Sequence, residues 1–244
     1  MTKEHKAITR GAVLITRPEQ SAHVTAEKLT ALGFSPVSLP VNRMIALPFN
    51  MLGTAIDALI MTSANALRYV PGEYLAMLKT IPVFAVGEGT TLAAQEAGFK
   101  TVIEGGGDAM RLAATIAKQL PNHARLLYLA GQVRQPVFED KMSEAGFAMD
   151  ICNVYNVEEI DYSANEIKAA LDKGPFVAVL LYSAVAAQIF VEKMQKFNVQ
   201  FDAETRFFCI SERVARQLPK IWQRKALIAD HPDESGIFRL FSKL

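Results

Sequence analysis

The chain has 244 residues, of which 50% are hydrophobic and 21% are charged, a composition typical of a globular protein with a large buried core. Its net charge is +1, so no broad basic surface for nucleic acid is expected. The sequence shows neither a signal peptide nor the ~18 apolar residues of a membrane-spanning helix, which predicts a soluble, cytoplasmic protein without a membrane partner. Cys152 and Cys209 lie in apolar runs without metal-ligand spacing and are expected to be buried thiols.

Short apolar runs alternate with amphipathic stretches of helical length, a pattern typical of βαβ units and parallel sheets. The expected strands are Ala12–Thr16, Pro36–Leu39, Ala58–Thr62, Val83–Val86, Thr101–Ile103, Arg125–Leu129, Val177–Leu181, Phe207–Ile210 and Ala226–Ile228. The expected helices are Glu19–Leu32, Ala64–Leu78, Thr90–Ala97, Ala109–Gln119, Gln135–Ala145, Ala184–Lys196, Arg213–Leu218 and Ser235–Leu240. The sequence therefore predicts an α/β fold.

Segments of the chain resemble other segments about half a chain later. Residues 12–20 and 32–44 resemble 125–133 and 145–157, residues 57–70 resemble 177–190, residues 83–95 resemble 207–218, and residues 100–116 resemble 225–241. Because these pairs recur in the same order, they indicate an internal duplication. Such a duplication predicts two flavodoxin-like lobes with parallel sheets, whose ligands gather beyond the carboxyl ends of the strands.

Short motifs follow one another along nearly the whole chain. They are Leu14–Pro18, Leu32–Phe34, Met61–Ala66, Val86–Thr90, Gly106 with Asp108, Leu129–Arg134, Val154–Tyr155, Leu181–Ala184 and Ile210–Ser211. In this order and spacing they resemble the uroporphyrinogen-III synthase family. That family's fold implies a discontinuous lobe 1 of residues 1–40 and 159–244. Lobe 2, residues 41–158, would be inserted through a two-stranded connector near residues 41–47 and 153–160.

The resemblance implies a monomeric lyase of heme biosynthesis that uses no cofactor and no metal. Its substrate would be hydroxymethylbilane, a linear tetrapyrrole with acetate and propionate side chains, supplied through a transient contact with hydroxymethylbilane synthase. The implied reaction closes this chain to uroporphyrinogen III, with inversion of ring D and loss of water. The four histidines show no metal-ligand spacing.

Two other classes of function stay open as alternatives. A two-lobed protein that binds or senses a small anion would use the same sites without catalysis. A nucleotide-dependent enzyme is disfavoured, because the glycines of Val86–Thr90 do not complete a dinucleotide-binding motif.

A substrate with many carboxylates suits helix N-termini, whose free amides and dipole favour an anion. Residues that follow strands and start helices are therefore the expected substrate contacts: Thr62, Ser63, Ala64 and Asn65, Gly87, Gly131, Ser183 and Ala184, and Ser211. For the serines, ordinary helix capping is the competing interpretation.

Three further kinds of position are expected at the site. Arg17 and Arg134 occupy related loops of the two repeats, and a guanidinium binds a carboxylate well, although exposed arginines are commonly only solvated. Tyr155 matches a connector tyrosine of the family, for which the resemblance implies a role in the departure of the substrate hydroxyl. Tyr182 stands where the family more often has a small hydroxyl residue, so it is expected either to contact substrate or simply to pack.

Overall fold

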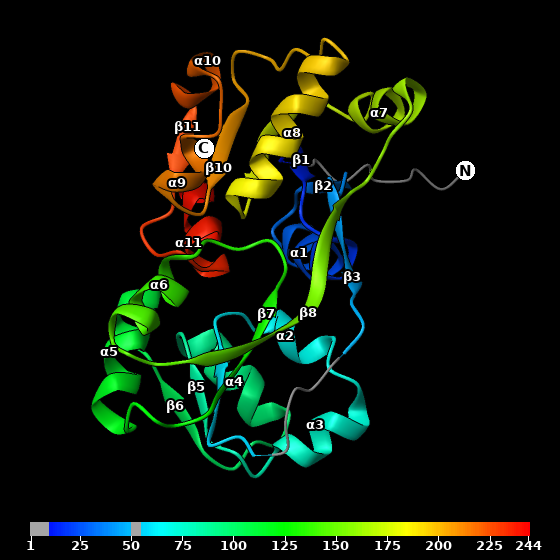
Figure 1. Ribbon diagram of the computed structural model, residues 1–244. Helices are drawn as coiled ribbons and strands as arrows, with labels where there is room; N and C mark the ends of the chain where they lie inside the picture. Colours follow the sequence, from blue (N-terminus) through cyan, green and yellow to red (C-terminus); the bar gives the residue numbers. More distant parts are fainter. Residues whose placement is uncertain (1–9, 50–54) are drawn as a thin grey trace. The chain divides into compact units, whose positions relative to one another are not determined.

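A computed structural model describes residues 10–49 and 55–244 (Figure 1). The chain forms two compact units: unit 1 is Met1–Arg43 with Glu158–Leu244, and unit 2 is Met44–Val157. Each unit contains one sheet with helices packed on both faces, so the predicted α/β fold is confirmed. Within the described residues, no helix is long and apolar enough to span a membrane.

The sheet of unit 1 has the strand order β11-β10-β9-β1-β2, and all its strands are parallel. The strands are β1 (Ala12–Ile15), β2 (Ser35–Ser38), β9 (Phe176–Leu181), β10 (Arg206–Cys209) and β11 (Ala226–Ile228). Every residue of β1 is buried, because helices cover both faces of a sheet of this kind.

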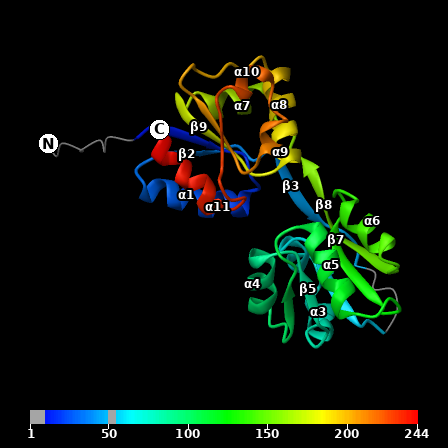
Figure 2. The ribbon, with the colours of Figure 1, turned by 90° about the vertical axis from the view of Figure 1, so that its left-hand side faces the viewer.

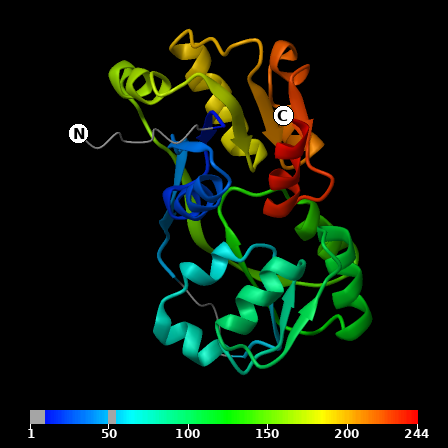
Figure 3. The same ribbon diagram turned by 180° about the vertical axis from the view of Figure 1, so that it is seen from behind.

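The helices of unit 1 lie on opposite faces of its sheet, as Figure 2 shows. One face carries α7 (Ala164–Leu171), α8 (Ala184–Lys196), α9 (Glu212–Ala215) and α10 (Lys220–Gln223). The other carries α1 (Glu19–Ala31), α11 (Glu234–Arg239) and the 3-10 helix η1 (Leu240–Lys243), and Figure 3 views this face with α1 in blue and α11 in red. Helices α7 and α10 were not expected from the sequence, although Ser163 and Glu166 form a capping box at the start of α7.

The sheet of unit 2 has the strand order β3-β8-β7-β4-β5-β6, and the five strands from β8 to β6 are parallel. The strands are β3 (Asn42–Ala46), β4 (Ala58–Met61), β5 (Val83–Ala85), β6 (Val102–Glu104), β7 (Leu126–Gly131) and β8 (Met149–Glu159). Beside β3 and β8, the amide of Leu47 donates to Val154 and that of Ile160 to Val41, each at 3.0 Å, as in an antiparallel pair.

Strands β3 and β8 cover most of the segments near residues 41–47 and 153–160, and β8 is longer than the expected strand. It begins at Met149, because its first part pairs with β7 from Met149 to Tyr155 and only its last part continues into the connector. The two units divide between Arg43 and Met44 and between Val157 and Glu158, which lie in these two strands.

Helices also cover both faces of the sheet of unit 2. One face carries α2 (Asn65–Arg68), α3 (Gly72–Leu78) and α4 (Glu88–Glu96), and the other carries α5 (Ala109–Gln119) and α6 (Val137–Glu144). The expectation of a single helix over Ala64–Leu78 is wrong. Pro71 separates α2 from α3, because proline disfavours helical backbone in the residue before it and lacks an amide to donate.

The two sheets have the same order when corresponding strands are compared. Strands β2-β1-β9-β10-β11 of unit 1 match β8-β7-β4-β5-β6 of unit 2, and these are the segment pairs that resemble each other in the sequence. In unit 1, the strands numbered along the chain follow the order 2-1-3-4-5 of flavodoxin-like sheets. In unit 2, the strands that correspond to the first two come last in the chain, so the same spatial arrangement is circularly permuted. The expected burial of Cys209 in unit 1 and of Cys152 in unit 2 is also confirmed.

Candidate functional site

The expected site residues lie at the carboxyl ends of the strands in both units. In unit 2, Thr62 follows β4, Gly87 follows β5, and Gly131 ends β7. In unit 1, Arg17 lies just beyond β1, and Tyr182 and Ser211 lie beyond β9 and β10. We call these two groups the carboxyl edge of unit 1 and the carboxyl edge of unit 2, and they are described separately.

Tyr155 packs against Gly131 at the carboxyl edge of unit 2. The two residues face each other across β7 and β8, next to a register shift between Ala130 and Gly131. A Cβ atom at position 131 would lie 2.6 Å from Cζ of Tyr155 and 2.8 Å from its hydroxyl oxygen. Only glycine therefore lets the tyrosine ring occupy this place.

The ring of Tyr155 is buried and fixed by its neighbours. The residue is 8% exposed, and the ring centroid of Tyr69 lies 5.4 Å away. Among the described residues, its hydroxyl makes no hydrogen bond. A phenol on a fixed ring is chemically suited to donate a proton.

Arg134 is held by three parts of unit 2. Its Nη1 donates to the carbonyl of Gly131 and to Oδ1 of Asn153, both at 2.7 Å. Its Nε donates to Glu139 of α6 at 2.5 Å, and the guanidinium lies 5.6 Å from the ring centroid of Tyr128. The side chain is only 21% exposed, so Arg134 is not a solvated surface arginine. Its Nη2 donates to no described residue.

Thr62 and Tyr128 form a hydrogen bond of 2.6 Å between their hydroxyl groups. Burial raises the pKa of Tyr128 above its ordinary value, while this bond and the charge of Arg134 act in the opposite direction. The hydroxyl of the next residue, Ser63, accepts a hydrogen bond from the amide of Asn65 at 3.2 Å, which is a local turn contact. The N-cap residue of α2 is Ala64, and no described side chain caps this helix, so Ser63 does not act as the capping residue.

Gly87 is the N-cap residue of α4, and no side chain caps this helix. A Cβ atom at Gly87 would lie 3.1 Å from Cα of Gly107, so the loops after β5 and β6 approach each other closely. The hydroxyl of Thr91, in the first turn of α4, is buried without a hydrogen-bond partner. The first amides of α4 are therefore free of side-chain caps, as an anion site at a helix N-terminus requires.

Arg17 is held by a network at the carboxyl edge of unit 1. Its Nη1 donates to Glu234 at 2.9 Å and to Thr25 at 3.1 Å. Thr25 donates to Glu234 at 2.8 Å, and Lys28 forms an ion pair with the same carboxylate. Burial raises the pKa of Glu234, but the hydrogen bonds from Lys28 and Thr25 and the charge of Arg17 outweigh it, so the pKa lies below its ordinary value.

Tyr182 packs beneath this network. The guanidinium of Arg17 lies 4.1 Å from the centroid of its ring, a cation–π contact. The hydroxyl is buried and makes no hydrogen bond of normal geometry to a described residue, although Arg17 and Thr25 lie beside it. Burial raises the pKa of Tyr182 to about 12, while Arg17 and Thr25 act in the opposite direction. These contacts favour the interpretation in which Tyr182 packs rather than offers its hydroxyl to a substrate.

The two serines of unit 1 differ in their helix contacts. Ser183 caps α8, because its hydroxyl accepts a hydrogen bond of 3.0 Å from the amide of Ala186 and Ala184 begins the helix. Ser211 precedes α9, and its hydroxyl makes no capping bond. The capping interpretation therefore accounts for Ser183 but not for Ser211.

Several residues that complete these edges were not found from the sequence. Glu139 lies five residues after Arg134, a local spacing that could have suggested a pair. Glu234 lies 217 residues from Arg17, and no sequence pattern joins them. The others are Thr25, Lys28, Tyr128 and Asn153. Among the residues that the structure describes, no group of three or more metal-ligating side chains occurs.

The fold and these edges define a class of protein: two duplicated α/β units, each with arginine, hydroxyl and helix-terminal amide groups at the carboxyl edge of a parallel sheet. The chain belongs to the uroporphyrinogen-III synthase HemD family, which it matches over residues 23–239.

Similar proteins support this assignment. Over 225 residues the chain is 24% identical to the porphyrin biosynthesis protein HemD of Ruminiclostridium josui, and the match covers 85% of this chain and 44% of that protein. The chain thus spans less than half the length of this curated relative.

Two solved structures resemble the fold over almost their whole length. The uroporphyrinogen-III synthetase of Helicobacter pylori has a TM-score of 0.69 and 19% identity, covering 96% of this chain and 99% of that one. A mutant uroporphyrinogen III synthase of Thermus thermophilus has a TM-score of 0.58 and 16% identity, covering 96% and 98%. At these identities the likeness shows the fold alone.

Proposed function

We propose that this protein closes hydroxymethylbilane to uroporphyrinogen III, with loss of water and without a cofactor. The observation that carries the proposal is membership of the uroporphyrinogen-III synthase family over residues 23–239. The geometry of the two carboxyl edges agrees with a substrate that bears many carboxylates.

Each edge, taken by itself, has groups that would bind a substrate carboxylate. In unit 2 these are the uncapped first turn of α4 after Gly87, the Thr62–Asn65 segment and the guanidinium of Arg134. In unit 1 they are the N-terminus of α8 at Ser183 and Ala184, the uncapped hydroxyl of Ser211, and Arg17 above Tyr182. Each arginine already forms an ion pair with a glutamate, which offsets its positive charge. Most of the attraction for substrate carboxylates would therefore come from the helix amides.

Tyr155 would act on the reacting end of the substrate. Its phenol donates a proton to the terminal hydroxyl as the carbon–oxygen bond breaks, so that water leaves and an electrophilic carbon remains on ring A. Ring D then attacks this carbon through its already substituted carbon, which gives a spirocyclic pyrrolenine. The bond from that ring D carbon to the ring C bridge breaks, and the freed bridge carbon bonds to the unsubstituted carbon of ring D, whose proton is released and restores the phenol. The protein would direct the attack to the inverting route by orientation, since free hydroxymethylbilane closes without inversion. Transient contact with hydroxymethylbilane synthase would limit that spontaneous loss.

The test is to generate hydroxymethylbilane in situ with its synthase and to resolve uroporphyrinogen I from III after oxidation. Predominantly isomer III with the wild-type protein is expected. Tyr155→Phe keeps the buried ring and removes the proton donor, so we expect kcat to fall on the order of 100-fold. Isomer I alone from folded wild-type protein would refute the proposal and favour the alternative of an anion-binding protein without catalysis.

A further inference from the structure

Arg134 joins the structural elements on either side of Tyr155. Its bond to the carbonyl of Gly131 holds the residue against which the tyrosine ring packs. Its bond to Asn153 holds β8 two residues before Tyr155. The guanidinium therefore fixes both halves of the contact between the ring and the glycine.

Glu139 is the group that keeps Arg134 in this position. The other acceptors, the carbonyls of Gly131 and Gln132 and Oδ1 of Asn153, are neutral, so Glu139 is the only carboxylate bonded to the guanidinium among the described residues. Both side chains of the pair are about three-quarters buried, at 21% and 27% exposure. A charge-assisted bond in such a place is stronger and better oriented than a neutral one.

We propose that Glu139 is a positioning residue: through Arg134 it holds the phenol of Tyr155 in place, and thereby sets the share of substrate that closes to isomer III. The inference rests on the proposed function. It assigns to Arg134 a second task besides contact with a substrate carboxylate. Without the carboxylate, the guanidinium would turn to water or to substrate, and both Gly131 and Asn153 would lose their bonds to it.

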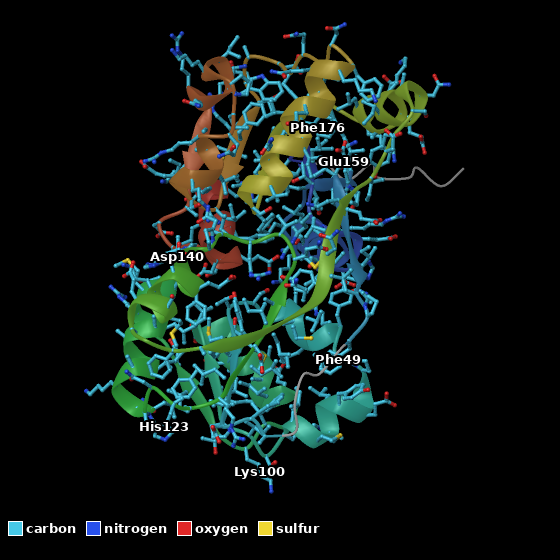
Figure 4. All side chains as sticks on the ribbon, viewed as in Figure 1. Phe49, Lys100, His123, Asp140, Glu159 and Phe176 are labelled. Carbon is cyan, nitrogen blue, oxygen red and sulfur yellow. The ribbon has the colours of Figure 1, made fainter. Side chains whose placement is uncertain are left out.

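A purely structural role for Glu139 is the competing explanation. The residue lies in the first turn of α6, where any carboxylate stabilises the helix N-terminus. Asp140 is the matched control, because it lies in the same turn, is exposed, and makes no ion pair with a described residue (Figure 4). Asp140→Asn removes the same charge from the helix end without touching Arg134.

The experiment compares wild type, Glu139→Gln, Asp140→Asn and Asn153→Ala in the coupled assay, with thermal unfolding as a check on folding. For Glu139→Gln we expect kcat to fall on the order of 10-fold, KM to change less than about 2-fold, and the share of isomer I to rise. Asn153→Ala removes the hydrogen bond between Arg134 and the Asn153 side chain without a change of charge. It should shift kcat and the isomer ratio in the same direction as Glu139→Gln. Asp140→Asn should behave as wild type.

Each other outcome decides against the inference. Equal losses in Glu139→Gln and Asp140→Asn would show that only the helix terminus matters. A raised KM with unchanged kcat and isomer ratio would make Arg134 a substrate ligand alone. If Glu139→Gln does not fold, an Asn153→Ala variant with wild-type kcat and ratio overturns the inference. Isomer I alone from the wild type would refute the proposed function itself, a result separate from all of these.

Discussion

The two units share a strand order but differ in how an arginine and a tyrosine meet at the carboxyl edge. In unit 2, Arg134 lies over Tyr128, whose hydroxyl bonds to Thr62 at 2.6 Å. In unit 1, Arg17 lies over the ring of Tyr182, whose hydroxyl is buried and makes no hydrogen bond of normal geometry to a described residue. Tyr182 stands at the position that corresponds to Thr62 in the repeat, so the tyrosine comes from a different strand in each unit.

This comparison shows that the two related sheets keep the same arrangement of strands, whereas the side-chain contacts at their carboxyl edges differ. Both edges place a guanidinium above an aromatic ring and beside a glutamate. Among the described residues, unit 2 adds a hydrogen bond between the tyrosine hydroxyl and Thr62, and a second tyrosine, Tyr155, lies on the neighbouring strand β8. The chemistry we propose therefore belongs to unit 2, while unit 1 contributes binding groups.

The largest effect should come from closing the space that Tyr155 occupies. Gly131→Ala places a methyl group 2.6 Å from the ring, so we expect a stability loss of about 1–3 kcal/mol and a severe loss of isomer III. Urea unfolding and the coupled assay measure these effects. Gly72→Ala, where nothing lies within 4 Å, is the control and should cost little. A Gly131→Ala protein with normal stability would mean that Tyr155 does not pack as described.

The next effect concerns the carboxylate that holds Arg17. Glu234→Gln removes the acceptor shared by Arg17, Thr25 and Lys28, so at about pH 7 we expect a loss of about 1–3 kcal/mol. The pKa of Glu234 is lowered from 4.5, so its contribution is present above that value and is lost as the pH falls through the folded-state pKa. The difference between wild type and variant should therefore shrink on acidification.

Urea unfolding across acidic pH measures this difference. Glu212→Gln is the matched control, because Glu212 pairs with Arg216 on the exposed surface and should contribute less than about 0.5 kcal/mol. A gap between wild type and Glu234→Gln that widened in acid would contradict the account of this network.

A smaller effect should separate the two tyrosines that lie beneath the arginines. Tyr128→Phe leaves the Thr62 hydroxyl without its partner and should cost about 1 kcal/mol. Tyr182→Phe removes a buried hydroxyl that makes no hydrogen bond of normal geometry to a described residue, although Arg17 and Thr25 lie beside it, so stability should stay the same or rise by up to about 1 kcal/mol. Equal losses in the two variants, by thermal or urea unfolding, would show that Tyr182 has a partner in solution.

The smallest effect is expected at the two serines of unit 1. Ser183→Ala removes the cap of α8 and should cost about 1 kcal/mol. Ser211→Ala removes a hydroxyl that caps nothing and should leave stability unchanged within about 0.3 kcal/mol. If Ser211→Ala lowered activity without a change in stability, that hydroxyl would serve the substrate.

The fold was largely predictable because its information is local. Apolar runs such as Ala12–Ile15 and Leu126–Gly131 are fully buried strands, and the repeat identified the corresponding strands of the two sheets. The errors were local as well. Pro71 interrupts a helix that looked continuous, and the capping box of Ser163 and Glu166 marked a helix that was not expected.

The candidate edges were predictable in position but not in contacts. A strand end identifies Arg17 or Arg134 as a residue of the edge, because loops follow strands in the sequence. It does not identify Glu234 as the partner of Arg17, since that pair depends on α11 packing beside α1. The packing of Tyr155 on Gly131 likewise depends on a register shift that no sequence pattern announces.

The positions of the two units along the chain determine the order in which their strands can pair during synthesis. Unit 2 is one continuous segment, Met44–Val157, whereas β1 of unit 1 pairs with β9, and Thr16 bonds to the carbonyl of Leu180, 164 residues away. On the ribosome, unit 2 emerges whole while β1 has only β2 as a partner, because β9 has not yet been made. The sheet that contains the first strands is therefore completed last, and the other edge of β1, a strand that is apolar throughout, stays unpaired until β9 has been made.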